Sequence, residues 1–192
     1  MAVPYDVPII GYGRKAVNTL RLWQSEPVKG FDFGAFDRQD YEKASESTVL
    51  AEAISDVLYP NDNYEKGLRL RLKQQYFFVS ASIQDIIRKY KKTHGNDFSE
   101  FAKCFALQLN DTHPTVAIPE LIRIFMFKEG MSFGEAFDIT QKTCNYTNHT
   151  VMAEALEKWN ADLFKSVLPT VYEIVLLINE HLKKYLASIG QT

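Results

Sequence analysis

The chain has 192 residues, of which 46% are hydrophobic and 24% are charged, a size and composition that suit one domain with a sizeable core. Its 22 Lys and Arg residues against 24 Asp and Glu residues give a net charge of -2, which argues against a dedicated nucleic-acid binder. The two cysteines, Cys104 and Cys144, match neither a disulfide framework nor a CxxC metal-ligand pair. No signal-like segment and no uninterrupted membrane-length apolar stretch occurs. We therefore expect a cytoplasmic protein that binds neither nucleic acid nor membranes.

No repeat, low-complexity tract or Ser/Gly linker interrupts the chain, which predicts one segment over residues 1–192 without an internal domain boundary. The spacing of prolines and glycines over Pro4–Gly13 forbids a regular helix there, and we expect a loop. The next segment, Val17–Trp23, has the β-branched and apolar content of a strand.

Apolar residues recur every three or four positions over Tyr41–Leu58, which predicts a helix with one largely apolar face that ends before Pro60. A second such pattern runs from about Arg69 and stops at His94-Gly95. Similar patterns predict further helices over Val116–Phe127, over Phe133–Lys142, from near Met152, and from Val167 to the C-terminus.

The short apolar run Phe105–Leu109 predicts a buried strand between two of these helices. The alternation of helix and strand indicates an α/β fold. A polar patch, Asn110–Pro114, then lies at the carboxyl end of the strand, where open α/β sheets bind ligands.

Three polar clusters follow predicted regular elements: Asn61-Asp62-Asn63, Asn110-Asp111-Thr112-His113 and Thr147-Asn148-His149-Thr150. Each cluster by itself is typical of a turn or a helix cap. Together they offer donors and acceptors that suit a neutral polyhydroxyl ligand, so a sugar fits better than a phosphate. His149 is then either a general acid or base or simply a hydrogen-bonding residue of a polar turn.

Two other patterns lead to weaker expectations. Asp111 and His113 are spaced like metal ligands, but the remaining histidines supply no matching spacing, and we expect no metal site. The cationic residues along the second helix favour a solvated face, with an anion site at Arg88 and Lys89 as the alternative.

Several segments, taken in order and nearly end to end, resemble the N-terminal half of the α-glucan phosphorylases, the family of glycogen, starch and maltodextrin phosphorylases. The segments are Val3–Asp6, Gly11-Tyr12, Val17–Trp23, Leu58–Asp62, Leu70–Gln74, Gln108–Pro114 and Tyr146–Thr150. A chance match of one short motif would not extend through the chain in this way.

The resemblance implies a retaining enzyme that cleaves α-1,4-glucan with orthophosphate and releases glucose 1-phosphate. It also implies pyridoxal phosphate as cofactor, supplying a phosphate as acid-base partner. The implied fold is a partial Rossmann-like N-terminal domain of a glycosyltransferase-B-type phosphorylase, in which two such domains face each other across a cleft.

The resemblance also assigns roles to residues of this sequence. Asn63 matches a loop residue that hydrogen-bonds the reacting glucose, and Asp62 belongs to the same mobile gate. His149 matches the histidine whose ring contacts a sugar hydroxyl and whose carbonyl faces the charge that develops at the anomeric carbon. The residues that match the acceptor side of the cleft and its surroundings are Asp111, His113, Thr150 and Ala155.

Two further assignments concern assembly and regulation. The helix Tyr41–Leu58 resembles the family's dimer-contacting helix, which implies a homodimer. Arg88 and Lys89 lie where activator-regulated members carry an arginine pair for a nucleotide. Lysine cannot reproduce bidentate recognition of phosphate, which argues against nucleotide activation.

The chain is about a quarter as long as a family polypeptide, and the half with the Schiff-base lysine and the phosphate-binding residues is absent from it. We therefore expect a fragment or split reading frame of a phosphorylase that is inactive alone. The alternative is an autonomous, non-catalytic glucan-binding or assembly module derived from the enzyme.

Overall fold

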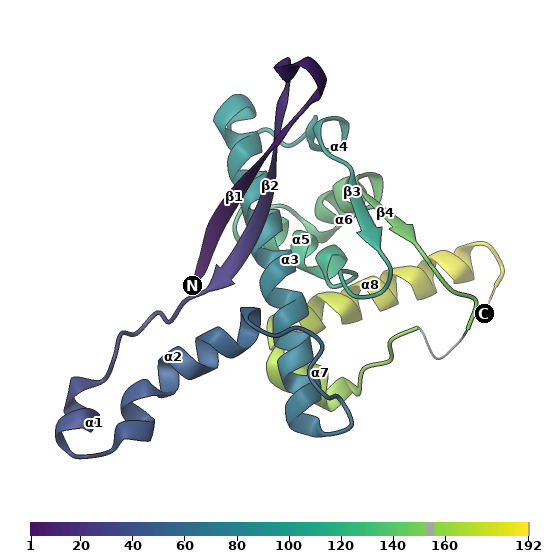
Figure 1. The fold of residues 1–192 in the computed structure, drawn as a ribbon. Coiled ribbons are helices and arrows are strands. Elements are labelled where there is room, and N and C mark those ends of the chain that lie inside the picture. The colour runs from purple at the N-terminus through teal and green to yellow at the C-terminus, as the bar shows by residue number, and fades with distance from the viewer. Residues whose placement is uncertain (153–155, 192) are drawn as a thin grey trace. The chain divides into compact units, whose positions relative to one another are not determined.

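A computed structural model describes residues 1–152 and 156–191 of the chain. Two compact units make up this range, Met1–Ala81 and Ser82–Thr192. The first contains a β-hairpin and helices, and the second contains helices and one short parallel strand pair (Figure 1). At this coarse level the mixture of helices and strands agrees with the predicted α/β class.

The first unit follows the chain from a hairpin into helices. Its elements are β1 (Ala2–Ile10), the 3-10 turn η1 (Tyr12–Arg14), β2 (Val17–Ser25), α1 (Phe33–Asp37), α2 (Tyr41–Ser55) and the first part of α3 (Glu65–His94).

The expectation of a loop from Pro4 onward was wrong, because most of that segment belongs to strand β1. β1 pairs antiparallel with β2, with Pro4 opposite Trp23 and Pro8 opposite Thr19 (Figure 1). The residues that flank β1, the odd-numbered Met1 and Gly11, make backbone hydrogen bonds to the other arm of the hairpin. The alternation of an antiparallel ladder then puts Pro4 and Pro8 at non-hydrogen-bonded positions, where a missing N–H costs nothing.

Helix α2 confirms the periodic pattern but ends at Ser55, before the expected Leu58. The buried amide of Gln74, on α3, donates to the carbonyl of Ala53 at 3.2 Å and to that of Val57 at 2.8 Å. The last carbonyls of a helix have no partner within the helix. Gln74 therefore supplies hydrogen-bond donors to backbone carbonyls at the C-terminal end of α2.

Helix α3 confirms the second periodic pattern and its end at His94. The next residue, Gly95, has φ of 62°, a left-handed conformation that glycine adopts without a steric penalty. The residues of its apolar face that are buried are Leu72, Val79, Ile83, Ile87 and Tyr90.

The second unit begins within α3 and ends in a long helix. Its further elements are α4 (Phe101–Cys104), β3 (Leu107–Asn110), α5 (Ala117–Phe127), α6 (Phe133–Thr143), β4 (Cys144–Thr147), α7 (Ala161–Val167) and α8 (Pro169–Ser188).

Aromatic rings form the core of this unit beside α3. The ring of Tyr90 lies 5.1 Å from that of Phe101 and 5.4 Å from that of Phe98, and Phe125 of α5 contacts both phenylalanines edge-on. The Tyr90 hydroxyl donates to the carbonyl of Asp97 at 2.7 Å, so the one polar group of this buried side chain has a hydrogen-bond partner. This cluster fixes the end of α3 against the segment that leads into β3.

Strands β3 and β4 form a parallel pair, joined by α5 and α6 (Figure 1). β3 confirms the strand predicted in this region, although only Leu109 is buried and its neighbours Gln108 and Asn110 are exposed. The helices predicted over Val116–Phe127 and Phe133–Lys142 are confirmed as α5 and α6. β4 was not predicted, because its residues are mostly polar and have no alternating apolar pattern.

The C-terminal segment contains one correction. No helix begins at Met152: the described residues 151–152 and 156–160 have no helical structure, and the next helix is α7. The expected terminal helix is confirmed as α8, which packs against α5 and in which Val171 and Ile174 are buried. Apolar residues farther along α8, such as Leu182 and Tyr185, are exposed.

A capping box begins α6 and makes its stability depend on pH. The Ser132 side chain accepts from the Glu135 backbone N–H, and the Glu135 carboxylate accepts from the Ser132 backbone and hydroxyl at 2.9 and 2.7 Å. The hydroxyl and backbone hydrogen bonds of Ser132 lower the pKa of Glu135. A lowered native pKa stabilises the fold above the carboxyl's unfolded pKa, and this contribution disappears as the pH falls through the native pKa.

We therefore expect Ser132→Ala to destabilise the protein more near pH 7 than near pH 3, because the lost bond from the hydroxyl to the Glu135 carboxylate is strongest when Glu135 is ionised, whereas the lost bond from the Glu135 N–H is the same at both pH values. Urea unfolding of both proteins at the two pH values measures the difference. Ser45→Ala is the control, since the Ser45 hydroxyl donates to a backbone carbonyl, that of Tyr41. An equal loss at both pH values for Ser132→Ala would contradict the expectation.

Candidate functional site

Strands β3 and β4 bring two of the three polar clusters together at their carboxyl ends. The parallel register pairs Asn110 with Thr147. One residue farther on, the backbone N–H of Asp111 donates to the carbonyl of Thr147 at 2.9 Å. The Gln108 amide donates to the Thr147 hydroxyl at 2.7 Å. Residues 39 apart in the sequence are thus neighbours, at the end of the sheet where the sequence predicted a ligand site.

The ring of His149 is held by the side chain of Asn110, whose Oδ1 contacts the ring Nε2. An amide oxygen only accepts hydrogen bonds, so Nε2 carries the hydrogen in this contact. In a neutral imidazole Nδ1 then keeps its lone pair. His149 is exposed, and this nitrogen is suited to accept a hydrogen bond from a hydroxyl group.

The backbone turns sharply after β3. Asp111 has φ of 65°, and its Oδ1 accepts from the N–H of Thr112 at 2.8 Å. Aspartate is one of the few residues that adopt this left-handed conformation readily, since its side chain can bond the local backbone. The Thr112 Oγ1 is buried and has no hydrogen-bond partner within residues 1–152 and 156–191. The turn therefore fixes the Asp111 carboxylate and leaves the buried Thr112 hydroxyl without a hydrogen-bond partner among the described residues.

His113 and Thr150 lie in the segments that follow β3 and β4. The His113 Nδ1 lies 3.7 Å from a carboxylate oxygen of Glu157, which was not among the predicted site residues. Thr150 is bound within its own loop: its N–H donates to Asn148 at 3.2 Å, and its hydroxyl accepts from Met152 at 3.1 Å. Thr150 thus has the turn role that was the alternative for each cluster. Ala155, the other predicted residue, lies outside the described residues.

The remaining cluster belongs to the first unit. Asn61 Oδ1 accepts from the N–H of Asn63 at 3.0 Å, which is a tight local turn. The Asp62 carboxylate pairs with Arg71 of α3 at 2.9 Å. A Cβ on Gly67 would lie 1.7 Å from the Asn61 carbonyl oxygen, so only glycine allows this loop to rest on the first turn of α3. Gly67 was not singled out by the sequence patterns.

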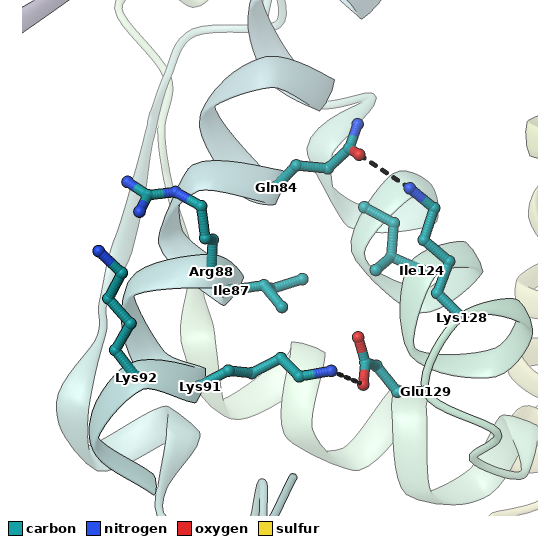
Figure 2. A pocket seen from close by; sticks show the side chains of 8 residues that line it. All are labelled: Gln84, Ile87, Arg88, Lys91, Lys92, Ile124, Lys128 and Glu129. Carbon is teal, nitrogen blue, oxygen red and sulfur yellow. Dashed lines mark hydrogen bonds and ion pairs between the residues drawn. The ribbon is translucent and has the colours of Figure 1, made fainter. Parts of the chain in front are cut away.

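The alternative anion site at Arg88 and Lys89 is partly neutralised. Both cations pair with the buried carboxylate of Asp85, at 2.6 and 2.8 Å. Arg88 also lines a shallow pocket of about 430 Å³ between α3 and α5. Figure 2 shows Lys91 reaching across this pocket to Glu129 (2.6 Å), while Arg88 extends away from α5. Arg88, Lys89 and Lys91 thus already have carboxylate partners, which weakens their attraction for an anion.

Within the described part of the chain, no three His, Cys, Asp or Glu side chains are close enough together to hold a metal ion. None of the described helices is long and apolar enough to cross a membrane.

Comparison with known proteins decides the family. The profile of the carbohydrate phosphorylase family matches residues 1–191. The chain belongs to this family. Its similarity to individual phosphorylases extends through the same residues. Glycogen phosphorylase 2 of Dictyostelium discoideum is 52% identical over 96% of the chain, the Saccharomyces cerevisiae enzyme 50% over 93%, and the human liver form 48% over 97%.

The chain spans 18–23% of the length of these relatives, about a fifth. The resemblance inferred from the motifs is therefore confirmed. Of the predicted site residues, the structure brings His149, Asp111 and His113 to the segments that follow β3 and β4. Asp62 and Asn63 form their own turn in the first unit.

Sequence reasoning missed the side chains that hold these residues. Asn110 was part of a cluster but was not chosen as a site residue, although it holds His149. Glu157 and Gly67 had no visible signal. A second strand prediction at Cys144–Thr147 would have identified Asn110 as the neighbour of the loop that carries His149.

Proposed function

We propose that this chain is part of an enzyme that cleaves α-1,4-glucan with orthophosphate and releases glucose 1-phosphate with retention. The observation that carries the proposal is sequence identity of about one half to proteins named glycogen phosphorylase, maintained through nearly all of the chain. The polar residues at the ends of β3 and β4 are compatible with this role, since glucan hydroxyls need both donors and acceptors.

His149 is the proposed contact to the reacting sugar. With Nε2 committed to Asn110, Nδ1 accepts from a sugar hydroxyl in this proposal. The same residue's backbone carbonyl oxygen, a fixed dipole, would face the positive charge that develops at the anomeric carbon. Such a preorganised dipole stabilises charge more in a dry cleft than in water. The family resemblance is the source of this second role.

The other site residues are proposed to bind glucan without reacting. Asp111 would accept from hydroxyls on the acceptor side, where its carboxylate is fixed by the Thr112 N–H. His113 and Thr150 would lie beside it, with Ala155 nearby. Asp62 and Asn63 would supply a loop that hydrogen-bonds the reacting glucose, and the Asp62–Arg71 ion pair and Gly67 would hold that loop on α3.

The lysines of this chain do not fit a Schiff base with pyridoxal phosphate. Such a lysine needs a desolvated pocket, whereas the lysines here are exposed and the half-buried Lys91 pairs with Glu129. We therefore attribute no step of that cofactor to these residues. In the proposed enzyme the cofactor would be bound by residues outside this sequence.

Exposed apolar surface supports a larger assembly in which this segment is one wall of a cleft. Large apolar side chains of β1 and β2 are exposed, among them Tyr5, Val7, Ile9, Leu20 and Leu22. Surfaces of this kind are normally covered by protein. We propose that other parts of the enzyme cover them and that the 192-residue piece alone is inactive. The parallel β3–α5–α6–β4 crossover is compatible with a partial Rossmann-like, glycosyltransferase-B-type domain.

Helix α2 is the proposed surface for a second copy of the enzyme. Its residues Tyr41, Val49 and Leu50 are exposed, although they are large and apolar. Free cysteines at positions 104 and 144 are compatible with a cytoplasmic location. A regulatory anion at Arg88 and Lys89 stays a weaker part of the proposal, because Asp85 already pairs with both.

The test is release of glucose 1-phosphate from maltooligosaccharide and orthophosphate. We expect activity from the native-length polypeptide that carries these residues, supplemented with pyridoxal phosphate, and none from residues 1–192 alone. Replacing orthophosphate by sulfate is the control and should abolish product. Saturable glucan binding without product from the native-length polypeptide would contradict the proposal and favour a non-catalytic glucan-binding module.

A further inference from the structure

Cys104, His94 and Thr93 form a short hydrogen-bonded chain at the end of α3, apart from the polar site described above. The Sγ of Cys104 lies 3.8 Å from the Nε2 of His94, and the Nδ1 of the same ring lies 2.7 Å from the Thr93 hydroxyl oxygen. All three residues are exposed. A thiol within hydrogen-bond reach of an imidazole that a third group orients is the arrangement of an activated nucleophile.

The bonds of Thr93 decide which ring nitrogen of His94 carries the hydrogen. The Thr93 hydroxyl donates its only hydrogen to the backbone carbonyl of Tyr90, at 3.0 Å. Its oxygen must then accept from His94, so Nδ1 is the protonated nitrogen. Nε2 of the neutral ring keeps its lone pair and faces the Cys104 thiol, where it can take the thiol proton.

The ring of His94 is held in place from one face. It stacks on the buried Tyr90 ring with centroids 4.4 Å apart and planes 4° from parallel. Tyr90 in turn is fixed by its hydrogen bond to the Asp97 carbonyl. The imidazole is therefore oriented by a packed aromatic cluster, even though the sulfur it faces is open to solvent.

The second cysteine of the chain has the opposite surroundings. Burial raises the pKa of Cys144 to about 11. Only the thiolate is a good nucleophile, so Cys144 is expected to be inert near neutral pH. Lys103 interacts electrostatically with Cys104 and also pairs with Glu100 at 2.8 Å.

We propose that Cys104 is a site of reversible S-thiolation by low-molecular-weight disulfides such as glutathione disulfide, with His94 as the base. Nε2 of His94 takes the thiol proton, and the sulfur of Cys104 attacks one sulfur of the disulfide. The bond between the two glutathione sulfurs breaks as the protein–glutathione bond forms, and the departing thiolate takes the proton from His94. The Cys104 sulfur is oxidised and the departing sulfur is reduced.

The size of the expected effect follows from thiolate chemistry. An ordinary cysteine is about 3% thiolate at pH 7, so complete deprotonation raises its rate of attack at most about thirty-fold. Nucleophilicity falls as a thiol becomes more acidic, which reduces the gain. We therefore expect His94 to accelerate thiolation of Cys104 by about ten-fold near neutral pH.

The experiment treats the native-length protein with glutathione disulfide and follows each cysteine by mass spectrometry of tryptic peptides. Trypsin cuts after Lys103 and after Lys142, so Cys104 and Cys144 fall on separate peptides, residues 104–123 and 143–158. We expect the peptide of Cys104 to gain one glutathionyl group at least ten-fold faster than that of Cys144, and to lose it with dithiothreitol.

Variants distinguish base catalysis by His94 from the effect of solvent exposure of the Cys104 thiol. His94→Gln should slow thiolation of Cys104 about ten-fold near pH 7 and have little effect near pH 10, where thiols in general are ionised without a base. Thr93→Val, which removes the hydroxyl that fixes the tautomer, should slow it less. His181→Gln is the matched control, since His181 packs on Phe133 and Phe137 and lies on α8.

Two results would overturn the proposal. One is thiolation of Cys104 in the unmodified sequence no faster than that of Cys144, a comparison that needs no variant and so does not depend on how a variant folds. The other is a His94→Gln protein, with an unchanged circular dichroism spectrum, whose Cys104 reacts at the original rate near pH 7.

Discussion

His149→Ala is expected to reduce kcat for phosphorolysis of maltooligosaccharide by about a hundred-fold in the native-length enzyme. The substitution removes the imidazole that Asn110 orients and with it the hydrogen bond proposed for the reacting sugar. The backbone carbonyl of residue 149 remains, but without the ring the reacting sugar is positioned less well, and a misplacement of about 1 Å costs about a hundred-fold in rate. Steady-state kinetics with orthophosphate and maltooligosaccharide measure the change.

The pattern of kinetic constants identifies the kind of loss. A contact made mainly in the transition state lowers kcat and kcat/KM together, whereas simple loss of glucan binding raises KM. Asn110→Ala should give an intermediate loss, since it frees the ring without removing it. His181→Gln is the control histidine, remote from the polar clusters in sequence and packed on Phe133 and Phe137. Activity of His149→Ala within two-fold of the original would contradict the assignment.

Gly67→Ala is expected to destabilise the protein by about 1–3 kcal/mol, the usual cost of overpacking. Within a helix this exchange normally stabilises, by as much as about 1 kcal/mol. Here the added Cβ would lie 1.7 Å from the Asn61 carbonyl oxygen and 2.7 Å from its carbon, which are backbone atoms that cannot swing aside. The loop of Asp62 and Asn63 must therefore move, and phosphorolysis should fall as well.

Gly134→Ala is the matched control for this prediction. Gly134 also lies in the first turn of its helix, α6, and a Cβ there would meet no atom within 4 Å. We expect this variant to be as stable as the original or slightly more stable. Chemical denaturation of the three proteins measures the stabilities. A Gly67→Ala protein with unchanged or greater stability would show that the Asn61 loop does not rest on α3.

The helices of this protein were largely predictable, because their patterns are local. Apolar residues repeat at helical spacing in α3, α5 and α6, and Gly95 ends α3 by a conformation that needs no distant partner. Family membership was also predictable from the short motifs and their order. Both kinds of information are present in contiguous residues.

The strands were predicted less well, because their partners decide them. Pro4 and Pro8 predicted a loop, yet they fit a strand because the register with β2 leaves their nitrogens facing away from the ladder. The polar segment Cys144–Thr147 becomes a strand only because β3 lies beside it. Strand propensity reflects such neighbours more than the residues themselves.

The candidate site divides in the same way. The sequence by itself determined the family, the helices and the residue types that suit a sugar, since each depends on neighbouring positions. Only the tertiary structure decided that Asn110 orients His149 and that Glu157 lies beside His113. It also decided that the Asn61 loop packs against the backbone at Gly67. The physical reason is that these are contacts between separate segments, whose geometry is set by strand pairing and helix packing rather than by any local pattern.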